Sequence, residues 1–145
     1  MQKIIIASHG YFSTGIEDSI KILIGERKNI EFIAAYREDI PDNKGLEKKL
    51  REIFENNREK VLVMFTDIKG GSITNTALSL LPEYSNLNIV SGMSLALVLE
   101  YILASEDEKE CNYKEIIKSC INEAKDGMLY LNTLVEGGKE NGEIL

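Results

Sequence analysis

The chain has 145 residues, of which 43% are hydrophobic and 28% are charged. This length suits one domain with its own core, and the balance is that of a globular protein rather than a disordered one. The formal net charge of −7 argues against binding to nucleic acid or to anionic membrane, because both require a basic surface.

The apolar runs and the cysteines bear on where in the cell the protein acts. No apolar run approaches the about 20 residues of a membrane-spanning helix. The apolar start at residues 4–7 is too short for a signal peptide, so we expect a cytoplasmic protein. Cys111 and Cys120 are too few for a zinc cage or a disulfide framework, and we interpret both as reduced structural thiols.

Strand-like segments recur along the chain. Residues 3–8 form an unbroken, β-branched run of the kind that is buried on both faces of a sheet. Further strands are expected at residues 30–36, 61–65 and 87–90, with a last one at residues 128–131.

Segments with helical periodicity separate these strands. The first is expected to be capped by Ser13 or Thr14 and to end at Gly25, and the third to begin at Ser72. The others are expected around residues 46–54, 95–103 and 116–124. Residues 95–103 are apolar nearly all round, which is typical of a helix in a core or a subunit interface.

This alternation predicts an α/β fold: a doubly wound, mostly parallel sheet with helices on both faces and a flavodoxin-like strand order. We expect a single domain over residues 1–135. Residues 136–145 are expected to form a flexible tail.

A histidine and an aspartate follow two strands that this order places side by side. His9 ends the first strand and Asp67 follows the third, so they should face each other where such sheets bind ligands. A carboxylate that accepts one ring N–H leaves the other ring nitrogen free as a nucleophile or base. The alternative is a histidine and an aspartate that merely cap turns, but their pairing at two strand ends favours a functional site.

Gly70, Gly71 and Ser72 form a loop before the third helix. Glycines let backbone N–H groups approach an anion, and a helix N-terminus carries positive potential. Ser72, Thr74 or Asn75 would add a side-chain donor. Taken alone, a Gly-Gly turn with Ser72 as an ordinary N-cap is the commoner arrangement, but beside a nucleophilic histidine the loop suits a cradle for a transferring phosphoryl group. The segment is not a P-loop, because the Gly-Lys-Ser/Thr ending is missing.

Three segments resemble the enzyme IIA domain of the mannose-type (mannose/fructose/sorbose) sugar phosphotransferase system. They are KIIIASHG at residues 3–10, TDIKGGSITN at residues 66–75 and VSGMSL at residues 90–95. The resemblance extends over about residues 1–134, and the second segment is the most specific. The chain departs from the family pattern at Ile73, where proline is frequent, and in the turn at Met93, Ser94 and Leu95.

The resemblance implies a phosphocarrier without cofactor or metal. His9 would accept a phosphoryl group from the histidine-containing phosphocarrier protein and pass it to a separate enzyme IIB component during sugar uptake. Asp67 would orient the His9 ring, and Ser72 would contact the phosphoryl group, with Gly70 and Gly71 in the cradle. No arginine is evident nearby, so backbone N–H groups are expected to do most of the stabilising.

The resemblance also implies a homodimer in which a C-terminal strand crosses between subunits, and residues 128–131 are the candidate strand.

Two other function classes fit the same residues. A regulatory binding module phosphorylated at His9 would report sugar flux without serving transport; a phosphoryl donor of a dihydroxyacetone kinase is a less well matched variant. The other class is a hydrolase or a small-ligand binder that uses the same crevice. A hydrolase with His9 as base needs a further nucleophile or a metal; Ser72 is the only candidate nucleophile, but no nucleophile-elbow motif surrounds it.

Overall fold

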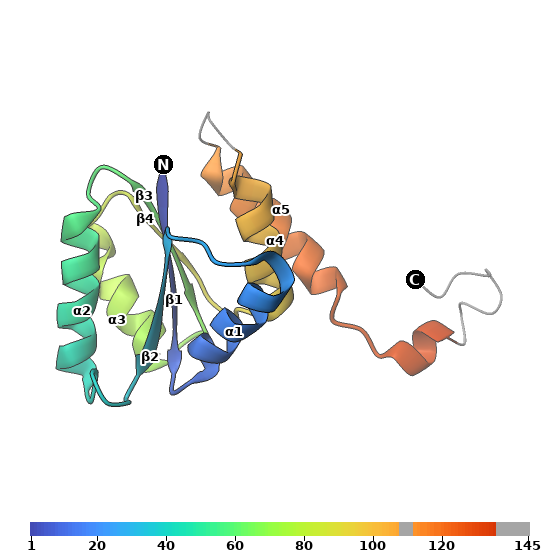
Figure 1. The fold of residues 1–145 in the computed structure, drawn as a ribbon, viewed down its shortest axis with the longest axis horizontal. Helices are drawn as coiled ribbons and strands as arrows, with labels where there is room; N and C mark the ends of the chain where they lie inside the picture. Colours follow the sequence, from blue (N-terminus) through green and yellow to red (C-terminus); the bar gives the residue numbers. More distant parts are fainter. Residues whose placement is uncertain (108–111, 136–145) are drawn as a thin grey trace. The chain divides into compact units, whose positions relative to one another are not determined.

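The computed structural model describes residues 1–107 and 112–135 (Figure 1). The chain divides into two compact units, Met1–Leu99 and Glu100–Leu145. Cys111 and the tail predicted at residues 136–145 lie outside the described residues. The single domain over residues 1–135 stays a prediction.

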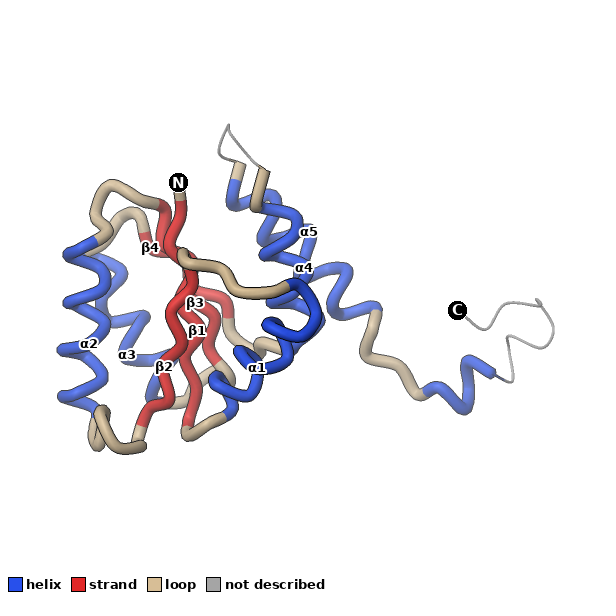
Figure 2. The backbone as a smooth tube through the Cα atoms, in the orientation of Figure 1, coloured by secondary structure: helices blue, strands red, loops and turns tan. Residues whose placement is uncertain are grey.

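Strands and helices alternate in the first unit (Figure 2). The strands are β1 (Gln2–His9), β2 (Ile30–Ala35), β3 (Val61–Thr66) and β4 (Leu87–Val90). The helices are α1 (Phe12–Ile24), α2 (Asn43–Asn56) and α3 (Ser72–Leu80), followed by the 3₁₀ turn η1 (Leu81–Glu83). The four strands predicted in this unit are confirmed to within one residue at each end.

The strands form one parallel sheet in the order β2-β1-β3-β4. This is the predicted flavodoxin-like arrangement, with β1 between β2 and β3. In the register, His9 lies beside Ala35 of β2, and Ala7 lies beside Thr66 of β3. Because all strands run in one direction, the residues that follow β1, β2 and β3 meet at one edge of the sheet.

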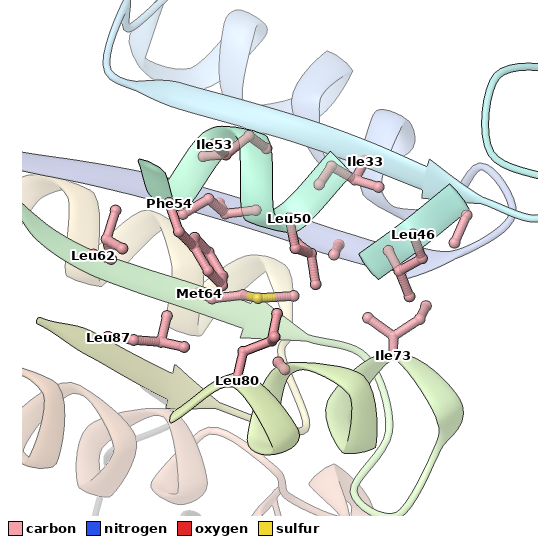
Figure 3. Close-up of a cluster of buried hydrophobic side chains, with 14 of the residues drawn as sticks. Ile33, Leu46, Leu50, Ile53, Phe54, Leu62, Met64, Ile73, Leu80 and Leu87 are labelled. Carbon is pink, nitrogen blue, oxygen red and sulfur yellow. The ribbon is translucent and has the colours of Figure 1, made fainter. Parts of the chain in front are cut away.

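The core on one face of the sheet is built by α2 and α3, and α1 covers the other face (Figures 1 and 3). Leu46, Leu50 and Phe54 of α2 and Ile73 of α3 are fully buried against Met64 of β3. Their helical spacing is the reason these helices lie flat on the sheet and bring the start of α3 to its carboxyl edge.

The start of α1 differs from the prediction. The helix begins at Phe12, so Ser13 and Thr14 lie inside its first turn and neither is its N-cap. The N–H of Ser13 donates instead to Oγ of Ser8 in β1 (2.7 Å), while Oγ of Ser13 donates to the carbonyl of Ile33 in β2 (2.7 Å). A side chain from the preceding strand thus satisfies the helix end that a local cap normally serves.

The last two helices are α4 (Leu95–Ser105), which crosses the boundary of the two units, and α5 (Tyr113–Asp126). Both confirm predicted helices. Cys120 in α5 is a buried free thiol, and burial raises the pKa of that thiol. Within the described residues, no helix has the length and apolarity that crossing a bilayer requires.

The strand predicted at residues 128–131 is wrong for the single chain. Residues 128–130 have no regular structure, and residue 131 begins a short helical turn. The N–H of Met128 donates to the carbonyl of Lys125 (3.1 Å), so it continues the last turn of α5. A strand needs a neighbour to pair its backbone groups, and this segment has none within the described part of the chain.

Candidate functional site

His9 is the last residue of β1, and the turn after it leaves its side chain at the sheet edge. Gly10 adopts φ 59°, a conformation that favours glycine, and its N–H donates to the carbonyl of Ala35 (2.9 Å). Oγ of Ser8 donates to the carbonyl of Gly10 (3.0 Å). The His9 side chain stays 41% exposed, so its ring is accessible to a reactant.

Asp67 holds His9 at both backbone and side chain. Its Oδ2 accepts the backbone N–H of His9 (2.7 Å) and lies 2.9 Å from Nδ1 of the ring, while its Oδ1 accepts the N–H of Ile68 (3.0 Å). A carboxylate only accepts hydrogen bonds, so Nδ1 carries the proton and Nε2 of the neutral ring is unprotonated. The two residues predicted to face each other are therefore in direct contact.

Gly71 allows a close approach of the loop to the His9 ring. A Cβ atom at Gly71 would lie 3.3 Å from Cε1 of His9 and 3.2 Å from the carbonyl of Ile68. The N–H of Gly71 is already donated to that carbonyl (3.1 Å). Gly71 thus serves the site through its missing side chain, while Gly70 supplies a left-handed turn with φ 79°.

Thr74 and Asn75, in the first turn of α3, hold this loop in place. Oγ1 of Thr74 lies 2.7 Å from both Oγ1 of Thr66 and the carbonyl of Ile68. Nδ2 of Asn75 donates to the carbonyl of Gly70 (3.2 Å). Thr74 and Asn75, considered as anion donors from the sequence, are therefore engaged in fixing the loop.

Ser72 reaches the ring nitrogen that Asp67 leaves free. Its Oγ lies 3.4 Å from Nε2 of His9. Ser72 is the first residue of α3 and Gly71 is the N-cap, so the interpretation of Ser72 as an ordinary N-cap is wrong. The first N–H groups of a helix have no acceptor within it, which leaves positive potential next to Ser72.

The loop after β2 adds two residues that sequence analysis missed. The ring of Tyr36 lies 5.5 Å from that of His9, centroid to centroid. Its Oη lies 2.5 Å from Oγ of Ser72 and donates to Oδ1 of Asn43 (2.5 Å). The guanidinium of Arg37 lies 4.9 Å from the Tyr11 ring centroid, and its Nε lies 3.7 Å from the Cβ position of Gly10.

Arg37 corrects the expectation that no arginine lies near His9. The position of Arg37 directly after β2 could have revealed it. Because β2 pairs with β1 in parallel, the residues that follow β2 reach the same edge of the sheet as His9.

Three large hydrophobic side chains that follow His9 or Asp67 in the sequence are exposed. Tyr11, Phe12 and Ile68 are all exposed, although they follow strands that are buried. Oη of Tyr11 donates to Glu38 (3.0 Å), and this hydrogen bond and the charge of Glu38 raise the pKa of Tyr11. No group of three or more His, Cys, Asp or Glu residues in the described ranges is arranged to hold a metal ion. The geometry therefore suits a nucleophilic histidine that reacts with a group brought by another molecule.

Comparison with known proteins agrees on one family. Residues 3–120 match the family model EIIA-man, described as the PTS system fructose IIA component. The mannose-specific EIIAB component of the PTS of Escherichia coli is 20% identical over 128 residues, which cover 86% of this chain and 38% of that protein. The fructose-specific EIIA component of Bacillus subtilis is 26% identical over 107 residues, which cover 73% of this chain and 72% of that protein. This chain thus spans well under half of the E. coli relative.

A solved structure has the same fold. The phosphotransferase system component EIIA from Streptococcus agalactiae superposes with a TM-score of 0.79 at 21% identity, covering 92% of this chain and 99% of that chain.

Replacement of Gly71 by alanine tests the close approach of the loop to His9. The new Cβ must displace the ring or the loop, so we expect the NMR signals of His9, the only histidine in the chain, to shift. Gly15→Ala in α1 is the matched control, since a Cβ there meets nothing within 4 Å. Unchanged His9 signals in Gly71→Ala would contradict the observed packing.

Proposed function

The chain belongs to the EIIA-man family of sugar phosphotransferase system components, and we propose that it carries a phosphoryl group on Nε2 of His9. The observation that supports this most directly is the 2.9 Å contact between Nδ1 of His9 and Asp67. It fixes the tautomer in which Nε2 presents a lone pair at an accessible edge of the sheet.

The transfer is a direct displacement at phosphorus. Nε2 of His9 attacks the phosphoryl group of a phosphorylated donor, the bond from phosphorus to the donor breaks, and its electron pair returns to the donor nitrogen. The proton stays on Nδ1 throughout, so the phosphorylated ring is cationic. The carboxylate of Asp67 stabilises that charge. Transfer onward reverses these changes and leaves His9 neutral again.

The surroundings of Nε2 suit a phosphoryl group, which brings a charge of about −1.5 to −2. Ser72 offers a hydroxyl 3.4 Å from Nε2, and the N-terminus of α3 offers backbone N–H groups. Gly71 keeps a side chain off the His9 ring, and Gly70 supplies the left-handed turn that shapes the loop. Arg37, at the adjacent turn, adds a positive charge that attracts the negatively charged phosphoryl group at long range.

The partners we propose are the histidine-containing phosphocarrier protein as donor and an enzyme IIB component as acceptor. Both must bring a small reactive group up to His9. Tyr11, Phe12 and Ile68, which follow His9 or Asp67 in the sequence, are exposed and offer apolar side chains for such contacts. On this role we also propose that the protein acts in the cytoplasm.

We further propose that the protein is a homodimer formed through residues 128–131. The four side chains of this segment, Met128, Leu129, Tyr130 and Leu131, are all exposed apolar groups. β4 is an edge strand of the sheet, and an edge strand pairs readily with a strand of a second chain. Pairing across two chains would bury these side chains and satisfy backbone groups on both sides.

The His9→Ala variant tests the phosphocarrier proposal. With phosphoenolpyruvate, enzyme I and the histidine-containing phosphocarrier protein, the wild-type protein is expected to gain one acid-labile phosphoryl group by intact mass, and His9→Ala none. Labelling that persists in His9→Ala would overturn the assignment of His9. Labelling of the wild type without onward transfer to any IIB component would instead favour the regulatory binding module.

The Asp67→Asn variant tests the role of the carboxylate. An amide donates as well as accepts, so the substituted side chain stabilises the tautomer with the proton on Nε2, and transfer should slow on the order of 100-fold. Rapid-quench measurement of the transfer rate checks this. Asp18→Asn, on the exposed face of α1, should transfer at the wild-type rate. A wild-type rate in Asp67→Asn would remove its proposed role.

Sedimentation velocity tests the homodimer. At micromolar concentration we expect a dimer for the wild type and a monomer for Leu129→Lys, because a charge in the proposed interface is costly to bury. Leu78→Lys in α3 is the control: Leu78 and Leu129 have matched exposures, 48% and 49%, and Leu78 lies outside the proposed segment. A wild-type monomer at these concentrations would refute the proposal.

A further inference from the structure

Tyr36 has a backbone conformation that residues with a side chain rarely adopt. Its φ is 65°, and it is the one residue other than glycine with a positive φ in the part of the chain that the structure describes. Its N–H donates to the carbonyl of Ile40 (2.6 Å), which closes a short turn after β2. Strain of this kind persists only where surrounding contacts enforce it, and it concentrates at functional sites.

The side chain of Tyr36 connects the two helices on its face of the sheet to His9. Its hydroxyl contacts Asn43, the first residue of α2, and Ser72, the first residue of α3. Its ring is tilted by 50° against the His9 ring. The unusual turn thus places the Tyr36 hydroxyl against Ser72, the one residue of the described chain whose hydroxyl contacts Nε2.

The protons of this group can be assigned by counting donors. Oδ1 of Asn43 only accepts, so the single proton of Tyr36 is donated to it. The 2.5 Å contact between Tyr36 and Ser72 then requires Ser72 to be the donor. With its proton committed to Tyr36, Ser72 turns a lone pair, and no proton, toward Nε2 of His9.

We propose that Tyr36 is a positioning residue for phosphoryl transfer, because it withholds the Ser72 proton from Nε2 in the unphosphorylated protein. This rests on the proposed function of His9. Without Tyr36, the Ser72 hydroxyl would donate to the unprotonated Nε2 and occupy the lone pair that must attack phosphorus. With Tyr36, the lone pair is free.

The same contact serves the phosphorylated state. When the phosphoryl group reaches Nε2, its oxygens are stronger acceptors than a phenol, so the Ser72 proton rotates from Tyr36 to a phosphoryl oxygen. Tyr36 keeps its hydrogen bond to Asn43, and the oxygens of Tyr36 and Ser72, which no longer share a proton, move apart. The proton of Ser72 is therefore available to the product and unavailable to the nucleophile.

Tyr36→Phe removes the hydroxyl and keeps the ring. In the unphosphorylated variant, Ser72 should donate to Nε2, and the ¹⁵N signal of Nε2 should move to lower frequency; His9 is the only histidine, so the assignment is unambiguous. The rate of transfer to His9 should fall about tenfold with an unchanged KM for the donor, the factor expected for breaking one hydrogen bond before reaction.

Two further variants separate positioning from a structural role. Asn43→Ala removes the acceptor, which frees the Tyr36 proton for Ser72 and should move the Nε2 signal in the same direction without altering Tyr36. Adding Ser72→Ala to Tyr36→Phe removes the competing donor and should return the signal to the wild-type position. Tyr84→Phe, which also loses one tyrosine hydrogen bond, to Glu55, should leave both signal and rate unchanged.

The outcomes are distinguishable from those of the proposed function. A wild-type protein that gains no phosphoryl group overturns the carrier role, yet the Nε2 signal still decides the hydrogen bonding. An unmoved signal in both Tyr36→Phe and Asn43→Ala overturns the proton assignment. A moved signal with a wild-type transfer rate overturns the positioning role.

Discussion

The contact between His9 and Asp67 is the constraint on which the site depends. It joins the ends of two neighbouring parallel strands, so it exists only because β1 and β3 are adjacent in the sheet. One carboxylate oxygen takes both the backbone N–H and the ring N–H of His9. Backbone position, ring orientation and tautomer are thereby set by a single side chain, and Ser72 and Tyr36 act on the nitrogen that remains.

Sequence patterns predicted the sheet well because its two central strands, β1 and β3, are buried on both faces. Such strands appear as short, continuous apolar runs, and the segment Val61–Thr66 is a clear example. The alternation with helices predicted the fold class. The flavodoxin-like order was a hypothesis within that class, and only on this hypothesis did the strand ends predict that His9 and Asp67 would face each other.

The parts that were missed depend on contacts between segments far apart in the chain. The partner of the Ser13 N–H is Ser8 on the preceding strand, which no local capping rule reveals. Residues 128–131 have strand-like composition, but composition does not supply a neighbouring strand. Tyr36 and Arg37 were overlooked because only the ends of β1 and β3 were considered, although β2 ends at the same edge.

The site lies at the carboxyl ends of the strands, so the connections at their other ends take no direct part in the proposed transfer. The connection at residues 25–29, between α1 and β2, lies at the end of the strands remote from His9 (Figure 2). Lengthening this connection should cost little folding free energy, since the entropic cost of closing a loop grows only slowly with added residues. A fluorescent label or an inserted domain at this connection would therefore stay clear of the path of the phosphoryl group.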